Sequence, residues 1–284
     1  MNNIKLYAFA DEASNQIPLQ IAAMKRNQLN GLEIRNVDGQ SIFDISSEKA
    51  RQVRRDMDAA GLQVYTIGSP VGKIDIETGN WELHKEKFKH LLEVTDILGA
   101  ENMRIFSFFI PAGKDPENYR NEVIDRLGWL LEQARGAVEL CHENEKEIYG
   151  DIASRCLTLY KALPELRAIF DPANFIQSGQ PTLPAWEMLH DYIKYMHIKD
   201  ALSDGKVVPP GCGEGHLRQI IPAYLAQGGR CFTIEPHLAL FDGLAALERE
   251  EVSDKVGNTY SFASKDEAFD TACQALKNIL KEIE

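Results

Sequence analysis

Short apolar or alternating segments recur along the chain, and each is followed by a stretch with helical periodicity. Eight segments have the alternation or the apolar run of a β-strand. They lie at residues 5–10, 31–36, 63–68, 102–108, 138–144, 166–171, 193–200 and 231–235. Regular alternation of such segments with helices predicts a parallel sheet that is covered by the helices.

The stretches between these segments predict amphipathic helices with clear end signals. The helices are expected at about residues 16–27, 47–60, 81–98, 118–135, 152–163, 183–190 and 219–227. Gly61, Gly99 and Gly228 follow three of them, at the position where a left-handed residue ends a helix. Ser264 and Glu267 form a capping box that begins a final helix.

Eight strands and eight helices without a linker-like tract predict a single domain. We expect a (β/α)8 TIM barrel, an α/β fold, over residues 1–284. The pattern alone leaves a doubly wound open sheet as the alternative. Loops that follow the strands of a barrel carry function, and those at residues 71–80, 109–117, 201–215 and 236–263 are long.

Composition and charge narrow the class of protein. Hydrophobic residues make up 44% of the chain and charged residues 26%, which is ordinary for a globular protein with a substantial core. The net charge of -12 opposes binding to nucleic acid, which needs clustered Lys and Arg. No apolar run approaches the roughly 18 residues of a membrane span, and the N-terminus lacks signal-peptide character, so we expect a cytoplasmic protein. The five cysteines form no CxxC pair, so reduced thiols are expected.

The segment 193–200 has one polar and one apolar face. As a strand it directs Tyr195, His197 and Lys199 to one side and Met196 and Ile198 to the other. This division is expected where a strand separates the interior of a barrel from the surrounding helices. The polar side therefore predicts a site at the mouth of the barrel.

Four consecutive strands each carry, at or near their ends, a side chain that can bind a metal ion. Glu143 belongs to the fifth strand, Asp171 to the sixth, His197 to the seventh and Glu235 to the eighth. A single strand-end carboxylate is more simply a surface residue or a helix cap, but four such residues on neighbouring strands are hard to explain as solvation. Carboxylates with one imidazole suit one divalent ion, Mn²⁺, Mg²⁺, Co²⁺ or Zn²⁺, with positions left for substrate oxygens.

Four short segments surround these residues: His142-Glu143-Asn144-Glu145, Ile169-Phe170-Asp171-Pro172, Met196-His197-Ile198-Lys199-Asp200 and Ile234-Glu235-Pro236. They resemble the sugar phosphate isomerase/epimerase family of xylose-isomerase-like TIM barrels. The resemblance covers nearly the whole chain, although the strands of the first half match mainly in pattern. That family includes ketose 3-epimerases, inosose dehydratases, hydroxypyruvate isomerases and, more distantly, an apurinic endonuclease.

The resemblance implies that Glu143, Asp171, His197 and Glu235 bind a single metal ion and that Glu143 and Glu235 are the acid/base pair. In this chemistry a carbon next to a chelated carbonyl loses a proton to one carboxylate and regains a proton from the opposite one. Epimerisation results, or isomerisation if the proton returns to the neighbouring carbon. The expected substrate is a small sugar, keto-sugar or polyol. An inosose-type dehydratase or another lyase is the alternative on the same site.

Further residues are candidates for substrate binding, namely Lys199, Glu145, Asn174, His237 and Arg35. Lys199 is expected either to bind a substrate oxyanion or to pair with Glu143 or Asp171, because a buried lysine needs a carboxylate partner. Asn174 stands where the family often has His, and an amide cannot carry a proton at neutral pH. The substrate or the proton route is therefore expected to differ from that of the ketose epimerases.

Arg35 and Glu33 point inward together from the second strand, and neutralisation of each other is favoured over contact with substrate. Glu145 either contacts the pocket or lies exposed, whereas His142 should face the helices as a packing residue. Lys73 and Arg104 could bind a phosphate, but without a phosphate-specific cluster the phosphorylation of the substrate stays open.

Two other classes of function are weaker on this sequence. A phosphodiester-cleaving DNA-repair enzyme of the same fold needs several metal ions and a basic groove, whereas the chain is acidic and few of its seven histidines lie at strand ends. A non-catalytic sugar-binding barrel has no need of opposed carboxylates on the fifth and eighth strands. Neither nucleic acid nor a membrane is expected as a partner. A homo-oligomer is compatible with the resemblance, although no segment indicates an interface.

Overall fold

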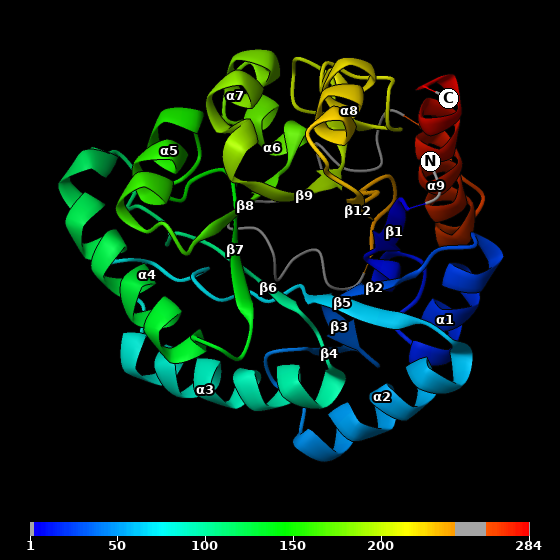
Figure 1. Ribbon diagram of the computed structural model, residues 1–284, viewed down its shortest axis with the longest axis horizontal. Coiled ribbons are helices and arrows are strands. Elements are labelled where there is room, and N and C mark those ends of the chain that lie inside the picture. Colours follow the sequence, from blue (N-terminus) through cyan, green and yellow to red (C-terminus); the bar gives the residue numbers. More distant parts are fainter. Residues whose placement is uncertain (1–2, 242–259, 284) are drawn as a thin grey trace.

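A closed barrel of eight parallel strands lies at the centre of the part of the chain that the structure describes, residues 3–241 and 260–283 (Figure 1). The structure is a computed structural model. The barrel strands are β1 (Lys5–Ala8), β2 (Gly31–Ile34), β5 (Gln63–Ile67), β6 (Asn102–Ile105), β7 (Glu139–Glu143), β8 (Arg167–Phe170), β9 (Ile193–Ile198) and β12 (Cys231–Ile234). Their order around the ring is β1, β12, β9, β8, β7, β6, β5 and β2.

Pairing of the first strand with the last closes the ring. Lys5 of β1 lies opposite Cys231 of β12, Ala8 lies opposite Ile234, and β2 pairs with the other side of β1. An open sheet would instead leave two edge strands unpaired. The prediction of a (β/α)8 TIM barrel is therefore confirmed, and the open-sheet alternative is wrong.

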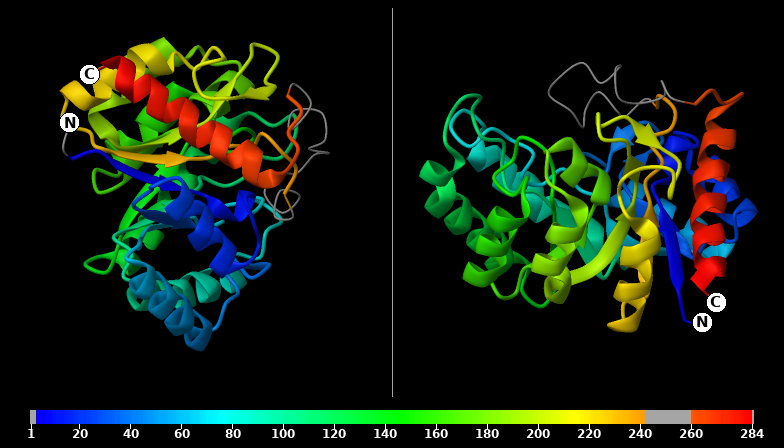
Figure 2. Two further views of the ribbon diagram at one scale, coloured as in Figure 1. Left: turned by 90° about the vertical axis from the view of Figure 1, so that its right-hand side faces the viewer. Right: turned by 90° about the horizontal axis from the view of Figure 1, so that it is seen from above.

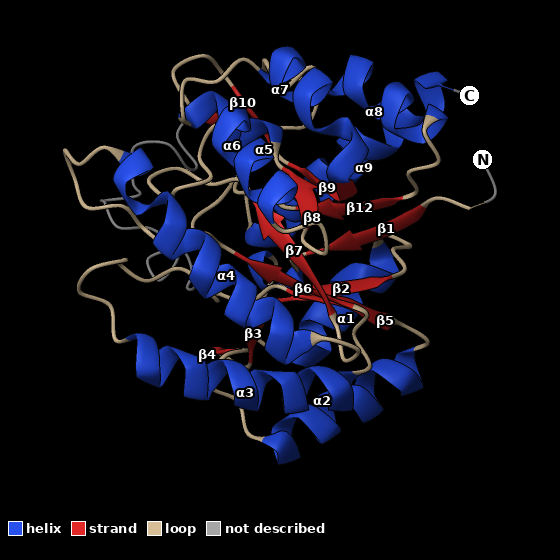
Figure 3. Ribbon diagram, turned by 60° about the vertical axis from the view of Figure 1, so that its left-hand side comes forward, coloured by secondary structure: helices blue, strands red, loops and turns tan. Residues whose placement is uncertain are grey.

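Helices surround the barrel, as the view coloured by secondary structure shows (Figure 3). They are α1 (Ile17–Arg26), α2 (Ser47–Ala60), α3 (Trp81–Leu98), α4 (Arg120–Ala134), α5 (Ala153–Ala162), α6 (Pro172–Gln177), α7 (Thr182–Leu189), α8 (Leu217–Ala226) and α9 (Lys265–Ile283). Figure 2 shows α9 beside β1, so the last helix covers the region where the ring closes. Among the described helices, none has the length and apolar character needed to cross a membrane.

The side chains of β9 divide as the alternation predicts. Tyr195 belongs to a small buried cluster inside the barrel, together with Tyr7, Tyr65, Cys141 and Ile169. Met196 and Ile198 belong to the main apolar core between strands and helices. His197 therefore lies on the interior side of the strand, where it faces other strands rather than a helix.

The predicted helix ends are confirmed where the structure describes them. Gly61 after α2 and Gly99 after α3 have left-handed backbones, with φ of 69° and 68°. At the start of α9, the hydroxyl of Ser264 accepts a hydrogen bond from the backbone N–H of Glu267 at 3.1 Å. Local capping chemistry therefore sets the limits of these helices as the sequence indicates.

Several short elements were not predicted from the sequence. Pro172 begins the short helix α6 directly after β8, whereas the next helix predicted from the sequence begins at about residue 183. The loops contain two small hairpins, β3 (Asn36–Val37) with β4 (Gln40–Ser41), and β10 (Asp200–Ala201) with β11 (Val207–Val208). Of the predicted loop at 236–263, residues 242–259 lie outside the described residues.

The loop after β5 depends on a neutral histidine. The imidazole of His84, on α3, accepts a hydrogen bond from the backbone N–H of Gly72 at 2.9 Å. Burial lowers the pKa of His84 to about 4. Because the unfolded chain binds this proton at about pH 6.5, the stabilisation by neutral His84 is complete above that pH and is lost as the pH falls toward 4.

We expect His84→Leu to lower the free energy of unfolding by about 1–3 kcal/mol at neutral pH, because the N–H of Gly72 loses its acceptor. The difference between wild type and variant should shrink as the pH falls through the window between the two pKa values, since a protonated His84 cannot accept the bond. Urea unfolding at a series of pH values measures this difference. A difference that is the same at every pH would contradict the role of His84.

Candidate active site

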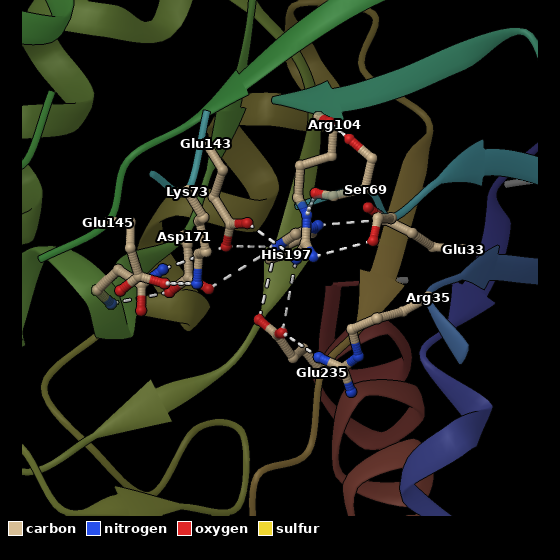
Figure 4. Close-up of polar contacts among 12 residues, drawn as sticks. Glu33, Arg35, Ser69, Lys73, Arg104, Glu143, Glu145, Asp171, His197 and Glu235 are labelled. Atoms are coloured by element: carbon tan, nitrogen blue, oxygen red, sulfur yellow. Dashed lines mark hydrogen bonds and ion pairs between the residues drawn. The ribbon is translucent and has the colours of Figure 1, made fainter. Parts of the chain in front are cut away.

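The carboxyl ends of β7, β8, β9 and β12 bring together the four residues that the sequence predicts as metal ligands. Glu143 is the last residue of β7, Asp171 follows β8, His197 lies near the end of β9 and Glu235 follows β12. One donor atom of each lies within 4.8 Å of the others, and all four residues are buried. Figure 4 shows these side chains, here called the four-residue cluster, pointing toward one another.

His197 has carboxylates at both of its ring nitrogens. Its Nδ1 lies 2.9 Å from Glu143 and 3.6 Å from Glu235, and its Nε2 lies 3.1 Å from Glu33. Burial opposes the charged form, but the carboxylates of Glu143 and Glu33 outweigh burial and raise the pKa of His197 to about 10. The ring therefore presents Nδ1 to the four-residue cluster and Nε2 to Glu33.

Asp171 uses one carboxylate oxygen for the fold and directs the other into the site. Its Oδ1 accepts a hydrogen bond from the backbone N–H of Asn174 at 2.9 Å and caps α6. Its Oδ2 accepts no hydrogen bond from the described residues, but it lies 3.0 Å from Lys199 Nζ as an ion pair. Burial raises the pKa of Asp171 to about 7 despite the charge of Lys199. A buried carboxylate oxygen that accepts no hydrogen bond is a suitable ligand for a cation.

Lys199 bridges two carboxylates of the four-residue cluster. Its Nζ lies 3.0 Å from Asp171 and donates a hydrogen bond to Glu235 Oε2 at 2.9 Å. Burial opposes ionisation of Glu235, but the charges around it, that of Lys199 first and those of His197 and Arg35 among the others, outweigh burial and hold the pKa of Glu235 well below its usual range. Among the described ion pairs, the predicted partner Asp171 is thus confirmed, and Glu235 rather than Glu143 is the second partner of Lys199.

Glu143 is held by a guanidinium and an amide. Its Oε2 accepts a hydrogen bond from Arg104 at 3.0 Å, and its Oε1 accepts one from the side chain of Asn174 at 3.1 Å. Burial opposes ionisation, but the charges of His197 and Arg104 lower the pKa of Glu143 to about 2. Glu143 is therefore ionised at neutral pH. Arg104, which the sequence left open as a phosphate ligand, is bound to this carboxylate.

Arg35 is bound to carboxylates that follow β1 and β12. Its guanidinium donates two hydrogen bonds to Asp11, at 2.9 and 3.0 Å, one to Glu12 at 3.3 Å and one to Glu235 at 3.1 Å. The guanidinium carbon also lies 4.4 Å from the centroid of the Phe9 ring. These contacts lock Arg35 beside Glu235, on the side opposite to Lys199.

The predicted neutralisation of Glu33 by Arg35 is wrong. Glu33 instead accepts hydrogen bonds from Tyr195 Oη at 3.0 Å and from His197 Nε2 at 3.1 Å. Glu33 lies within β2, where it faces β9 across the interior, whereas Arg35 lies beyond the strand end and reaches the segment after β1. Glu33 and Arg35 therefore have different partners, because β2 ends between them.

Glu145 and His142, which the sequence analysis also considered, have partners outside the four-residue cluster. Glu145 pairs with Lys73 at 3.0 Å, and since their side chains are 13% and 7% exposed, Glu145 is not a surface residue. His142 is confirmed as a packing residue, because its ring nitrogens contact the hydroxyls of Tyr160 and Ser107 at 3.1 and 3.0 Å.

The sequence can be placed among known proteins by comparison. A family model described as "Xylose isomerase-like TIM barrel" matches residues 21–237, which is well over half of the chain. The chain belongs to the xylose isomerase-like TIM barrel family. This confirms the resemblance seen in the short segments around the four-residue cluster. No curated protein sequence gives a significant match.

Solved structures of xylose isomerase-like barrels share the fold at low sequence identity. D-psicose 3-epimerase from Clostridium cellulolyticum H10, determined with D-tagatose, has a TM-score of 0.74 and 14% identity, over 99% of this chain and 100% of its own. The probable 3-DHS dehydratase AsbF from Bacillus anthracis has a TM-score of 0.72 and 16% identity, over 97% and 99% of the two chains. The IOLI protein with a zinc atom has a TM-score of 0.73 and 14% identity, over 99% of each chain. Enzymes of this fold therefore catalyse different reactions, and the fold alone does not choose among them.

Two acidic residues of this xylose isomerase-like barrel, Asp11 and Glu12, were not predicted as part of the site. They lie in the short helix η1 (Ala10–Glu12) just after β1 and are 3% and 4% exposed. The predicted strand ran on to Ala10, and the acidic pair that follows it was given no role. The signal was nevertheless the same as at β12, where a carboxylate directly follows an apolar strand.

We expect Lys199→Met to lower the free energy of unfolding of the metal-free protein by about 3–5 kcal/mol. Methionine has a similar shape to lysine but no charge, so Asp171 and Glu235 would lose their buried cationic partner. Urea unfolding in the presence of a chelator measures the change. Lys206→Met is the matched control, since Lys206 pairs with Asp204 on the exposed surface, and it should cost less than about 1 kcal/mol. Equal effects of the two substitutions would contradict the buried bridge.

Proposed function

We propose that this protein is a divalent-metal-dependent isomerase or epimerase of a small sugar, keto-sugar or polyol. One observation carries the proposal: two ionised glutamates, Glu143 and Glu235, both approach Nδ1 of His197 in one buried cluster, at 2.9 and 3.6 Å. Epimerisation and isomerisation need a base that removes a proton from carbon and an acid that returns one. Two carboxylates beside one substrate position can supply both functions.

The residues proposed to hold the metal ion are Glu143, Asp171, Glu235 and, through Nδ1, His197. Their donor atoms lie within 4.8 Å of one another, and three carboxylates with one imidazole are a donor set that Mn²⁺, Mg²⁺, Co²⁺ and Zn²⁺ accept. Asp171 Oδ2 supports the fit, because this buried oxygen already faces a cation, Lys199 Nζ at 3.0 Å, and accepts no hydrogen bond from the described residues. A bound divalent ion supplies a Lewis acid that polarises a carbonyl and acidifies the neighbouring C–H bond.

Glu33 is proposed to position His197 for metal binding. It accepts a hydrogen bond from His197 Nε2, and a second bond from Tyr195 Oη anchors its carboxylate. A proton kept on Nε2 leaves the lone pair of Nδ1 facing the four-residue cluster, which is the tautomer that a ligating histidine needs. Glu33 therefore acts through His197 and not on the substrate.

Glu143 and Glu235 are proposed as the acid/base pair. Each carboxylate is oriented by two donors, Arg104 and Asn174 for Glu143, and Arg35 and Lys199 for Glu235. One carboxylate takes the proton from carbon. The other, after it has taken up a proton from solvent, delivers that proton to the opposite face, which inverts the centre. Return of the proton to the neighbouring carbon gives isomerisation.

The substrate is proposed to lie against Lys199, Glu145, Asn174, His237 and Arg35. Lys199, Asn174 and Arg35 each donate a hydrogen bond to a carboxylate of the acid/base pair, so they orient these groups as well. The fold neighbour determined with D-tagatose supports a small carbohydrate as substrate. Neighbours determined with zinc and with magnesium support a divalent ion.

Exchange of substrate hydrogen with D₂O tests the proposed proton transfer. The metal-loaded protein should incorporate deuterium into at least one member of a panel of ketoses, inososes and keto-glycosides, and a chelator should abolish the exchange. Glu143→Gln and Glu235→Gln should each slow the exchange by about 10²- to 10⁴-fold, because an amide cannot accept the proton. Proton NMR measures the exchange.

Glu139→Gln is the matched control, because Glu139 begins β7 at the far end of the barrel and pairs with Lys194. It should leave the exchange unchanged. Undiminished exchange in both Glu143→Gln and Glu235→Gln would overturn the assignment of the acid/base pair. A product that has one water molecule fewer than the substrate would instead assign the lyase alternative.

Metal affinity tests the role of Glu33. We expect Glu33→Gln to weaken Mn²⁺ binding by about 10- to 100-fold, because an amide that donates to Nε2 of His197 would place the ring proton on Nδ1. Calorimetric titration measures the affinity. Tyr195→Phe keeps the Glu33 carboxylate and should have a smaller effect, and an unchanged affinity in Glu33→Gln would contradict the positioning role.

A further inference from the structure

The imidazole of His237 has a buried nitrogen that lacks a partner. Its Nε2 forms no hydrogen bond with any described residue, although His237 is only 8% exposed. Oε1 of Glu12 and Oε1 of Glu235 each lie 3.8 Å from this nitrogen, which is too far for a hydrogen bond. Buried polar atoms in folded proteins are usually satisfied, so this nitrogen points to a group that is absent from the chain itself.

The His237 ring is held firmly in this position. The backbone N–H of His237 donates a hydrogen bond to Glu12 Oε2 at 2.6 Å, which joins the segment after β12 to the segment after β1. The ring stacks on Phe241, with centroids 5.4 Å apart and planes 14° apart. The backbone of His237 is left-handed, with φ of 45°, a conformation that surrounding contacts must maintain in a residue other than glycine. The unpartnered nitrogen therefore belongs to an ordered side chain.

Charge decides what kind of group fits beside this nitrogen. A second cation would meet the guanidinium of Arg35, which already donates hydrogen bonds to the same oxygens of Glu12 and Glu235, at 3.3 and 3.1 Å. A phosphate or carboxylate would be repelled by the carboxylate of Glu235. An uncharged hydroxyl meets neither obstacle, and it can donate or accept with Nε2 in either tautomer.

We propose that Glu12, Glu235 and His237 form a subsite for a hydroxyl group of the substrate. The proposal rests on the proposed function and deepens it, because Glu235 belongs both to this subsite and to the four-residue cluster. Its Oε2 bonds Lys199 on the cluster side, whereas its Oε1 faces Arg35 and His237. A hydroxyl at the subsite therefore lies close to the carbon whose proton Glu235 moves.

This arrangement defines the class of substrate. The substrate is an uncharged polyhydroxy carbonyl compound. Its carbonyl and the neighbouring hydroxyl face the four-residue cluster, and it carries at least one further hydroxyl that reaches His237. A phosphate or carboxylate at this end of the molecule is disfavoured by the negative charge of Glu235. The sequence left the phosphorylation of the substrate open, and the subsite answers that question for the end that meets His237.

Two probes separate the subsite from the rest of the site. Hydroxyacetone has a carbonyl and one neighbouring hydroxyl, whereas L-erythrulose has the same pair and further hydroxyls. In the metal-loaded protein, kcat/KM for deuterium exchange should be about 10- to 100-fold higher for L-erythrulose. His237→Phe should remove this preference, because it should lower kcat/KM on L-erythrulose by at least about 10-fold more than kcat/KM on hydroxyacetone. His237→Gln should retain part of the preference.

His190→Phe is the matched control, because His190 lies at the opposite end of the barrel, next to Gln227. It should keep the preference for L-erythrulose. Equal rates on the two probes in the wild type, or an equal loss on both in His237→Phe, would overturn the subsite and leave the proposed function standing.

Binding distinguishes failure of the function from failure of the subsite. If the wild type exchanges neither probe, the proposed proton transfer is not supported for these compounds, and calorimetric titration of the metal-loaded protein with L-erythrulose decides the inference. Binding that is at least about 10-fold weaker in His237→Phe than in wild type supports the subsite. Equal binding, or no binding to the wild type, overturns it.

Discussion

The ionised carboxylates at the mouth of the barrel depend on cationic side chains that lie among them. An isolated buried charge is unfavourable by several kcal/mol, so a site of this kind needs compensation within hydrogen-bonding distance. The compensating residues are Arg35, Arg104, His197 and Lys199, and each contacts at least one carboxylate at 3.1 Å or less. The closed barrel makes this arrangement feasible, because its strands direct side chains from distant parts of the chain into one enclosed volume.

Glu235 connects the two halves of the site. One of its oxygens faces Lys199 and the four-residue cluster, and the other faces Arg35 and the segment after β1. If Glu235 moves a proton, the hydroxyl subsite beside His237 lies next to the carbon that reacts. Recognition and chemistry would then share one carboxylate, so the specificity of the enzyme and its rate should depend on the same contacts.

Position along the strands could be predicted from the sequence, and so could the pairing of Lys199 with Asp171 at the end of the neighbouring strand. The other pairings between side chains of the site could not. Alternation places His197 and Lys199 on the inner face of β9 because successive side chains of a strand point to opposite sides. The partner of Nε2 of His197 is Glu33, which is 164 residues away in the sequence, and no local sequence pattern indicates a contact between such distant residues. The helix α6 was missed for a different reason, since a proline such as Pro172 is compatible both with the end of a strand and with the first turn of a helix.

The most direct test is a crystal structure of the protein soaked with Mn²⁺, with the ion located by anomalous scattering. We expect one strong peak bound to Glu143, Asp171, Nδ1 of His197 and Glu235, while Nε2 of His197 keeps its hydrogen bond to Glu33. Such a peak would establish that the buried carboxylates form a metal centre. A peak elsewhere would contradict a metal centre at these carboxylates. So would the absence of a peak in a structure where Lys199 and Arg104 keep their contacts with the carboxylates.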